Sequence, residues 1–187
     1  MSSNQSRHII KLQTRRDFYK YLAKLGVKTG CEVGVKAAAN ACDMLTRIPD
    51  LQLYLVEPYC DYDGVDFKRG QRAHNINMLE AVNRINKKKF AYNIRWIFEK
   101  SEDAHRKIPD ESLDFVYIDG NHDYDYHMLD LILYSRKVKP GGIISGHDYN
   151  FPGLCAATND FARFHKYKPI YLTERDTNIT FYFFKGG

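Results

Sequence analysis

The sequence has 187 residues, of which 44% are hydrophobic and 27% charged, a composition that fits one globular domain. Its formal net charge of +5 is modest, and the lysines are scattered apart from the triplet at 87–89, so we expect no nucleic-acid partner. The four cysteines form no CxxC pair, which argues against a zinc site or a disulfide framework. No apolar stretch has the length of a membrane span or a signal peptide, so we expect a cytoplasmic protein without a membrane partner.

The first predicted element is a short amphipathic helix that follows residues 1–12, which we expect to be disordered. Thr14 has the residue type of an N-cap, and Asp17 stands three positions later, where a capping-box acid belongs. Apolar residues then recur at helical spacing, and Gly26 is placed to end the helix. We therefore predict one helix before the first strand.

From residue 29 onward, apolar runs of strand length alternate with segments of helical periodicity. The predicted strands are 29–35, 51–57, 93–99, 113–119, 143–147, 168–172 and 178–185. The predicted helices are 37–47, 71–89, 101–108, 124–138 and 153–166. The sequence Pro140-Gly141-Gly142 predicts a turn just before the strand at 143–147.

Strands that alternate with helices in this way predict an α/β fold, with helices on both faces of a parallel sheet. The turn-rich segment 174–178 is too short for a parallel crossover, so we expect the last strand to run antiparallel. The sequence thus predicts a Rossmann-like, doubly wound, mostly parallel seven-stranded sheet with an antiparallel last strand. Because no repeat or linker interrupts the chain, we expect a single domain over residues 1–187.

The ends of the first two strands carry residues suited to an adenosine ligand. Gly34 lies at the end of the first strand and lets backbone approach a ligand, and Glu32 lies two residues before it. Glu57 ends the second strand at roughly the spacing at which an acid holds ribose hydroxyls. The Gly-x-Gly-x-x-Gly motif of dinucleotide sites is absent, as is a phosphate-binding loop. A cofactor with adenine and ribose but no phosphate fits better, and S-adenosylmethionine (SAM) is such a molecule.

Four polar residues lie at the ends of two later strands of the predicted sheet. Asp119 ends the strand at 113–119 and His122 follows it, while His147 ends the strand at 143–147 and Asp148 follows it. Because the carboxyl ends of parallel strands meet at one edge of the sheet, all four side chains should converge near Glu32 and Glu57. Convergence of acids and histidines at such an edge is typical of a catalytic site.

These motifs resemble the class I SAM-dependent methyltransferases, most closely the group of macrocin and mycinamicin sugar O-methyltransferases in methyltransferase domain family 24. The resemblance covers about residues 29–150, and its most specific parts are Tyr117-Ile118-Asp119-Gly120-x-His122 and Gly141-Gly142-x-x-x-Gly146-His147-Asp148-Tyr149. It implies that the residues binding SAM are Glu32 near the methionine part, Gly34, Glu57, Ser101 near the adenine, and Asp119.

The resemblance also implies a metal site, which metal-dependent members build from an acid after strand four and a pair after strand five. These positions correspond to Asp119, His147 and Asp148. The histidine departs from the family pattern, because Mg²⁺ prefers oxygen ligands. The metal is therefore Mg²⁺ only if His147 is not a ligand, and otherwise Mn²⁺ or another ion that accepts nitrogen. A site without a metal is the remaining alternative.

His122 occupies the position of the general base proposed for the sugar O-methyltransferases, and Asp119 is assigned with it to catalysis. A sugar hydroxyl is a weak nucleophile, so a base or a metal must take up its proton during methyl transfer. The alternative for His122 is a purely structural turn residue before the helix at 124. We expect O-methylation of a hydroxyl on a sugar, glycan or similar small polyol.

Three other functions compete with this one. A non-catalytic SAM-binding protein is possible in principle, an NAD-dependent oxidoreductase lacks the required glycines, and a nucleic-acid N-methyltransferase lacks the Pro-Pro motif after strand four. The expected partner is a small-molecule or glycan acceptor, and the sequence leaves the oligomeric state open, a homo-oligomer included. The acceptor pocket should come from the N-terminal helix, 58–70 and 149–160. The rings of Tyr59, Tyr62, Phe67, Tyr149 and Phe151 either stack on a sugar there or serve local packing.

Overall fold

The structure is a computed structural model that describes residues 11–61, 70–168 and 170–186. The first helix, α1 (Arg15–Lys24), begins with the predicted capping box: the Thr14 hydroxyl accepts from the Asp17 amide, and the Asp17 carboxylate accepts from the Thr14 amide. The helix ends at the predicted place, where Gly26 has a positive φ of 74°. The expected disorder at 1–12 concerns residues that lie outside the described ones, except for 11 and 12.

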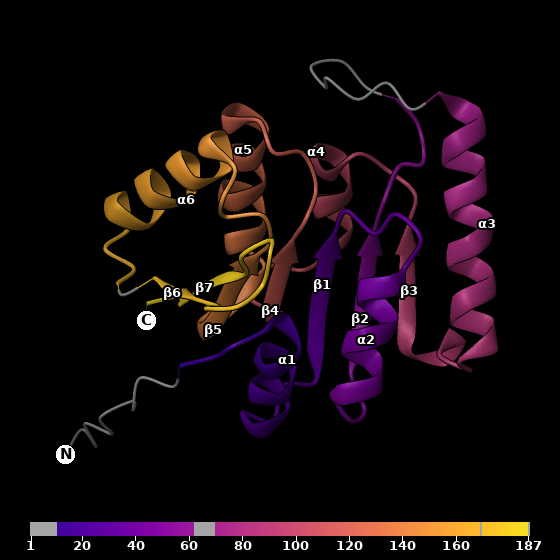
Figure 1. The fold of residues 1–187 in the computed structure, drawn as a ribbon, viewed down its shortest axis with the longest axis horizontal. Coiled ribbons are helices and arrows are strands. Elements are labelled where there is room, and N and C mark those ends of the chain that lie inside the picture. The colour runs from indigo at the N-terminus through magenta and orange to yellow at the C-terminus, as the bar shows by residue number, and fades with distance from the viewer. Residues whose placement is uncertain (1–10, 62–69, 169, 187) are drawn as a thin grey trace.

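The seven-stranded sheet confirms the predicted topology (Figure 1). Its strand order is β3-β2-β1-β4-β5-β7-β6. The first five strands pair in parallel, and β7 pairs antiparallel with both β5 and β6. The strands are β1 (Thr29–Val33), β2 (Gln52–Val56), β3 (Ile94–Ile97), β4 (Leu113–Ile118), β5 (Val138–Gly146), β6 (Tyr171–Leu172) and β7 (Phe181–Phe184).

Helices cover both faces of the sheet (Figure 1). They are α2 (Ala39–Arg47), α3 (Gln71–Lys87), α4 (Ser101–Ala104), α5 (Tyr124–Ser135) and α6 (Pro152–Phe164), with 3₁₀ turns η1 (Ala91–Asn93) and η2 (His105–Lys107). The helices α1, α2 and α3 pack on one face around Leu53, Leu55 and Tyr117. The helices α4, α5 and α6 pack on the other around Val33, Val56 and Val116. The alternation of side chains along each buried strand thus builds two apolar cores, one on each side.

One turn prediction was wrong. Pro140-Gly141-Gly142 lies inside β5, whose pairing with β4 shifts from Leu113↔Val138 to Phe115↔Ile143. The extra residues form an irregularity in the strand, with Gly141 at a φ of +78°. The backbone here is held by the last strand, because the Gly141 amide donates to the Lys185 carbonyl at 2.9 Å and the Lys185 amide to Gly142 at 2.8 Å. Tertiary pairing therefore extends the strand through a sequence that would otherwise form a turn.

The segment before α1 meets the β6–β7 connection beside the sheet. The amides of Glu174 and Arg175, in the connection between β6 and β7, donate to the carbonyls of Leu12 and Gln13 at 3.1 and 2.9 Å. The Asp176 carboxylate accepts from the backbone amide of Arg15 at 2.5 Å, at the start of α1. This contact fixes the first turn of α1 against the β6–β7 connection. None of the helices in the described part of the chain is long and apolar enough to cross a membrane.

Candidate active site

The carboxyl ends of β1, β2, β4 and β5 lie at one edge of the sheet, because these strands are parallel. Backbone hydrogen bonds also join the residues that follow neighbouring strands. The Gly34 amide donates to the Val56 carbonyl at 3.0 Å, and the Asp119 amide donates to Val33 at 2.7 Å. The His147 amide donates to Ile118 at 3.0 Å. The residues that follow these strands are thus held side by side, as the sequence predicts for a site at the carboxyl edge.

Gly34 is required by packing between two of these tips. Its φ is +89°, and a Cβ at this position would lie 2.1 Å from the Asp119 carbonyl oxygen. No side chain fits there without moving the backbone of the segment after β4. The glycine therefore lets the loop after β1 pass directly against Asp119, which brings the predicted cofactor residues and the predicted catalytic residues together.

The Glu57 carboxylate shapes the loop that follows β1. Its Oε2 accepts from the backbone amides of Val35 and Lys36 at 3.0 and 2.9 Å, and its Oε1 accepts from the Tyr59 amide at 3.3 Å. The loop has left-handed backbone at Lys36 and Ala38, so α2 begins at Ala39, two residues later than predicted. Glu57 thus lies at the predicted edge, and its carboxylate accepts hydrogen bonds from the two backbone amides that follow Gly34.

Glu32 is completely buried at the base of this loop. Its Oε1 accepts from the Asn40 side-chain amide at 2.7 Å, and Asn40 in turn accepts from the Tyr19 hydroxyl. Among the described residues, Oε2 of Glu32 has no hydrogen-bond partner. Burial raises the pKa of Glu32 well above its usual range, although the hydrogen bond from Asn40 opposes this. A buried acid with one open oxygen is suited to a cationic ligand.

Ser101 begins α4, at the tip of β3. Its carbonyl accepts from the Tyr134 hydroxyl at 3.1 Å, which ties α4 to α5. Burial raises the pKa of the neighbouring Asp130 to about 7, and a hydrogen bond with the Ser101 side chain opposes the rise. Ser101 is therefore at the predicted edge of the sheet, but its contacts within the chain are made with α5.

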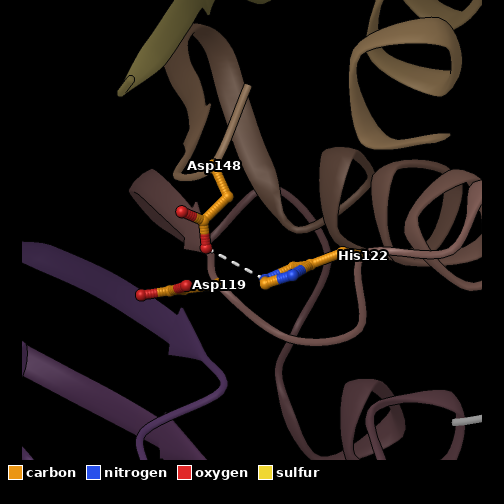
Figure 2. A group of neighbouring side chains, drawn as sticks. All are labelled: Asp119, His122 and Asp148. Atoms are coloured by element: carbon orange, nitrogen blue, oxygen red, sulfur yellow. Dashed lines mark ion pairs between the residues drawn. The ribbon is translucent and has the colours of Figure 1, made fainter. Parts of the chain in front are cut away.

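Two acids and one histidine after β4 and β5 form one group (Figure 2). Asp119, His122 and Asp148 each offer a ligand atom, and these three atoms lie within 4.8 Å of one another. His122 Nε2 is 3.0 Å from Asp148 Oδ2, as the dashed line in Figure 2 shows. Asp148 has a positive φ of 61°, and its side chain is only 7% exposed. This group is arranged to hold a cation or to handle a proton.

His147 and Asn178 complete the surroundings of Asp148. His147 Nδ1 lies 3.2 Å from Asp148 Oδ1 and 3.9 Å from Asp119 Oδ1. The Asn178 side-chain amide donates to the same Asp148 oxygen from the β6–β7 connection. The structure thus brings together all four predicted residues, but His122 rather than His147 shares the three-residue group with the two acids.

The two acids differ in electrostatic character. Burial raises the pKa of Asp119 to about 6, and the nearby Asp148 charge adds to this while His147 opposes it. Burial also acts on Asp148, but hydrogen bonds from His122 and His147 outweigh it and lower its pKa. The hydrogen bond to Asp148 raises the pKa of His122, against the effect of burial. Near neutral pH, Asp148 is ionised, whereas Asp119 and His122 can exchange protons.

Aromatic residues of the predicted acceptor pocket have different positions. The Phe151 ring lies 4.7 Å from the His122 ring, and its residue is 38% exposed. Tyr149 donates its hydroxyl to the Asn159 side chain at 3.0 Å. Tyr59 is only 4% exposed and donates to the Lys36 carbonyl at 2.7 Å, so it belongs to local packing and not to an open pocket. Tyr62 and Phe67 lie outside the described residues.

Sequence reasoning missed four residues that contact the site. Asn40 and Tyr117 had a detectable signal, since Asn40 lies in the first turn of the helix that follows Glu32 and Tyr117 pairs in register with Glu32. Asn178 had no such signal, because its contact with Asp148 depends on how the β6–β7 connection folds. Arg15 begins α1, and although burial opposes it, the nearby Tyr19, Tyr117 and Asp119 raise the pKa of its guanidinium.

Comparisons with known proteins agree with this geometry. The sequence model of a methyltransferase domain family, Methyltransf_24, matches residues 13–149. A solved structure assigned as a caffeoyl-CoA O-methyltransferase of Staphylococcus aureus superposes with a TM-score of 0.67 at 13% identity, covering 94% of this chain and 85% of that one. An O-methyltransferase of Bacillus cereus, solved in complex with SAH, gives 0.64 at 12% identity, with 90% and 79% covered. No curated protein matches the sequence significantly.

Proposed function

The chain belongs to the methyltransferase domain family and has the class I, SAM-dependent fold; on this basis we propose that it methylates a hydroxyl oxygen of a sugar, glycan or similar small polyol. SAM supplies an electrophilic methyl group on its sulfonium when bound. The single observation that carries the oxygen assignment is the group of Asp119, His122 and Asp148 at the carboxyl edge. A hydroxyl needs such help to lose its proton, whereas a free amine is already nucleophilic.

The residues at the tips of β1, β2 and β3 fit SAM. Glu32 offers a buried, unpaired oxygen to the cationic end of the cofactor. Gly34 leaves no side chain over the loop, and Glu57 lies beside it at the end of β2, where an acid holds ribose hydroxyls. Ser101 is placed for the adenine end at the start of α4. We assign Asp119 to the boundary between cofactor and acceptor, because its backbone packs against Gly34.

His122 is our candidate for the general base. Its Nε2 points at Asp148, whose ionised carboxylate raises the pKa of the imidazole and orients the ring. A base whose pKa lies near the working pH is the most effective, and the raised pKa of His122 keeps it basic enough to accept a hydroxyl proton. Asp148 therefore acts on His122 as the acid of a catalytic pair acts on its histidine.

The same group fits a divalent cation. Two carboxylates and one imidazole would hold it, from Asp119, Asp148 and either His122 or His147. This mixed oxygen and nitrogen set suits Mn²⁺ better than Mg²⁺, which prefers oxygen alone. A bound cation would lower the pKa of an acceptor hydroxyl. If His122 is a ligand through Nε2, it loses the contact with Asp148 that raises the pKa of the imidazole, so metal and base are alternative roles for this side chain.

The acceptor class is supported by the surface beside His122. The partly exposed Phe151 ring lies next to the imidazole, and an aromatic face of this kind packs against the apolar face of a sugar. The rival functions are weaker: the family match disfavours an NAD-dependent oxidoreductase, and the intact acid and histidine group disfavours a non-catalytic SAM-binding protein.

The test is transfer of labelled methyl from SAM to a panel of monosaccharides, nucleotide sugars and polyols, alongside amines of matched size. We expect label on oxygen. The variant His122→Ala should lower turnover by about 10²- to 10⁴-fold with unchanged SAH affinity. The control His165→Ala, which removes an exposed imidazole at the end of α6, should leave turnover unchanged. Label on nitrogen or carbon would refute the oxygen assignment, and full activity of His122→Ala would refute its role.

Metal dependence is tested separately by treating the protein with a chelator and adding back Mn²⁺ or Mg²⁺. We expect activity to fall with the chelator and to return more fully with Mn²⁺. Turnover that a chelator leaves intact would remove the cation from the proposal and leave proton uptake to His122.

A further inference from the structure

A groove of about 460 Å³ lies between α6 and the segment that leads into β6, at one end of the molecule (Figure 1). This volume is within the range of small-molecule sites, roughly 300–1,000 Å³. The residues that line the groove are Tyr149, Asn159, Asp160, Ala162, Arg163, Lys168, Ile170 and Leu172. It therefore combines an aromatic ring and aliphatic side chains with charged and amide groups. Such a mixture suits a carbohydrate, whose ring has an apolar face and polar edges.

The groove carries an unbalanced positive charge. Its one acid, Asp160, is already paired inside the chain, because it accepts from Arg163 at 2.7 Å and from the Tyr124 hydroxyl at 3.0 Å. Arg163 uses one of its amino groups for this contact and its side chain is 76% exposed, so further donors remain for a ligand. Lys168 forms no ion pair within the part of the chain that the structure describes. Two cations against one acid favour an anionic ligand.

Tyr149 connects this groove to the candidate active site. It directly follows Asp148 in the chain, and its backbone amide donates to the Ile179 carbonyl at 3.0 Å. Its hydroxyl donates to the Asn159 side chain on α6, also at 3.0 Å. Both ends of the residue are thus fixed, and its ring lies at the end of the groove that is next to the two acids of the site.

The helix α6 extends from the candidate site to the groove. Its first turn packs on the segment after β4, since a Cβ at Gly153 would lie 3.0 Å from the His122 carbonyl oxygen. The Phe151 ring at its start lies 4.7 Å from the His122 ring. From Phe151 to Asn159 the helix rises by about 12 Å, at about 1.5 Å per residue. This is longer than one sugar ring, so a ligand that reaches both places extends beyond the ring beside His122.

We propose that this groove binds an anionic group of the acceptor, a carboxylate or phosphate carried beyond the sugar ring that is methylated. Lys168 and Arg163 bind the anion, and the aliphatic side chains and Tyr149 pack against the connecting part of the acceptor. The acceptor is then an acidic saccharide or a glycosyl phosphate, and a neutral free sugar is a poor substrate. This inference rests on the proposed methylation of a sugar or polyol.

The test measures, with SAH bound, the affinity of sugars in pairs that differ in charge. One pair is a diuronate disaccharide and its neutral dimethyl ester, and the other is a sugar 1-phosphate and the neutral methyl glycoside of the same sugar. Each pair is used in the gluco, galacto and manno series, so that no single configuration decides the result. NMR amide shifts report both affinity and position.

We expect the anionic member of a pair to bind about five- to tenfold more tightly than the neutral one, the range of one or two exposed ion pairs. Its amide shifts should include 159–163 and 170–172. A preference in the first pair assigns the anion as a carboxylate, and a preference in the second assigns it as a phosphate.

Three variants test which cation is responsible. Lys168→Met should reduce the preference to about twofold or less. Arg163→Met should abolish it, because this change also leaves the Asp160 charge unpaired in the groove. The control Lys24→Met removes an exposed lysine in the last turn of α1 and should keep the full preference. Lys168 is exposed as well, so neither lysine substitution should disturb the fold, and SAH affinity verifies this for each variant.

Equal affinity for the charged and neutral members of every pair would overturn the inference, and so would a preference that Lys168→Met leaves intact. If the members bind equally while labelled methyl is still transferred to sugar oxygen, the groove assignment fails and the proposed function stands. If no sugar of either kind binds or accepts label, the sugar acceptor itself is refuted, so the two failures are distinguishable.

Discussion

Replacing Asp148 by asparagine tests the electrostatic account of the site without any substrate. The Asp148 side chain is 7% exposed and lies 3.0 Å from His122 Nε2 and 3.2 Å from His147 Nδ1. Asparagine keeps the shape but removes the charge that stabilises protonated His122. A hydrogen bond to a charged group contributes about 1.5–3 kcal/mol. Since His122 is 28% exposed, we expect the free energy of unfolding to fall by about 1–2 kcal/mol, below the buried-pair range.

This loss should depend on pH in a definite window. Asp148 has a lowered pKa, so its contribution is present above about 3.8, its unfolded value, and is lost as the pH falls toward the folded pKa. His122 has a raised pKa, so its contribution is full below about 6.5 and is lost as the pH rises through the folded pKa. The difference in stability between wild type and Asp148→Asn should therefore be largest between about pH 4 and 6.5.

Urea unfolding at several pH values, with a chelator present, measures this difference, and NMR titration of the histidines measures the pKa of His122 directly. The control Asp103→Asn removes an exposed acid that pairs with Arg106 at 3.0 Å, and should cost less than about 1 kcal/mol at every pH. A variant with wild-type stability throughout the window, or with an unchanged His122 pKa, would refute the reasoning.

Three further predictions concern the fold and the cofactor loop. Gly34→Ala should destabilise the protein by about 3 kcal/mol in urea unfolding, because alanine is strained at the positive φ and its Cβ would clash with the Asp119 carbonyl. Gly26→Ala, at a similar φ but in open space, should cost only about 1 kcal/mol. Equal costs for the two variants would contradict the packing argument. Thr14→Ala should lower stability by about 1 kcal/mol through loss of the capping box, and an unchanged unfolding midpoint would count against it. Glu57→Ala should weaken SAH binding by about 1.5–3 kcal/mol in calorimetry, because the loop after β1 loses its acceptor; unchanged affinity would exclude Glu57 from the site.

The elements that the sequence predicted best are those whose local pattern and tertiary role agree. The capping box at Thr14 is a purely local arrangement, and it forms as predicted. The apolar runs before Asp119 and His147 are buried on both faces, so they have no alternative to a central strand, and their ends had to meet at one edge. That is why the acids and histidines of the site could be placed together from sequence.

The features that escaped prediction depend on contacts between distant segments. Pro140-Gly141-Gly142 has the local chemistry of a turn, but pairing with the chain near Lys185 keeps it in β5. Both histidines lie beside the acids, since His147 Nδ1 is 3.2 Å and His122 Nε2 is 3.0 Å from Asp148; sequence alone could not show that His122 would complete a group with both acids. Arg15 had only the pattern of an exposed helix residue, because nothing near it in the sequence indicates Tyr117.

The contact between residues 12–15 and the β6–β7 connection has a consequence for synthesis. Asp176 holds the first turn of α1, and two positions later Asn178 holds Asp148, so the β6–β7 connection contacts both α1 and the candidate site. A chain emerging from the ribosome makes α1 first but cannot fasten it until the β6–β7 connection has also emerged. The sheet from β1 to β5 can assemble before then, without this closure. The reactive edge is thus completed only when the β6–β7 connection is in place.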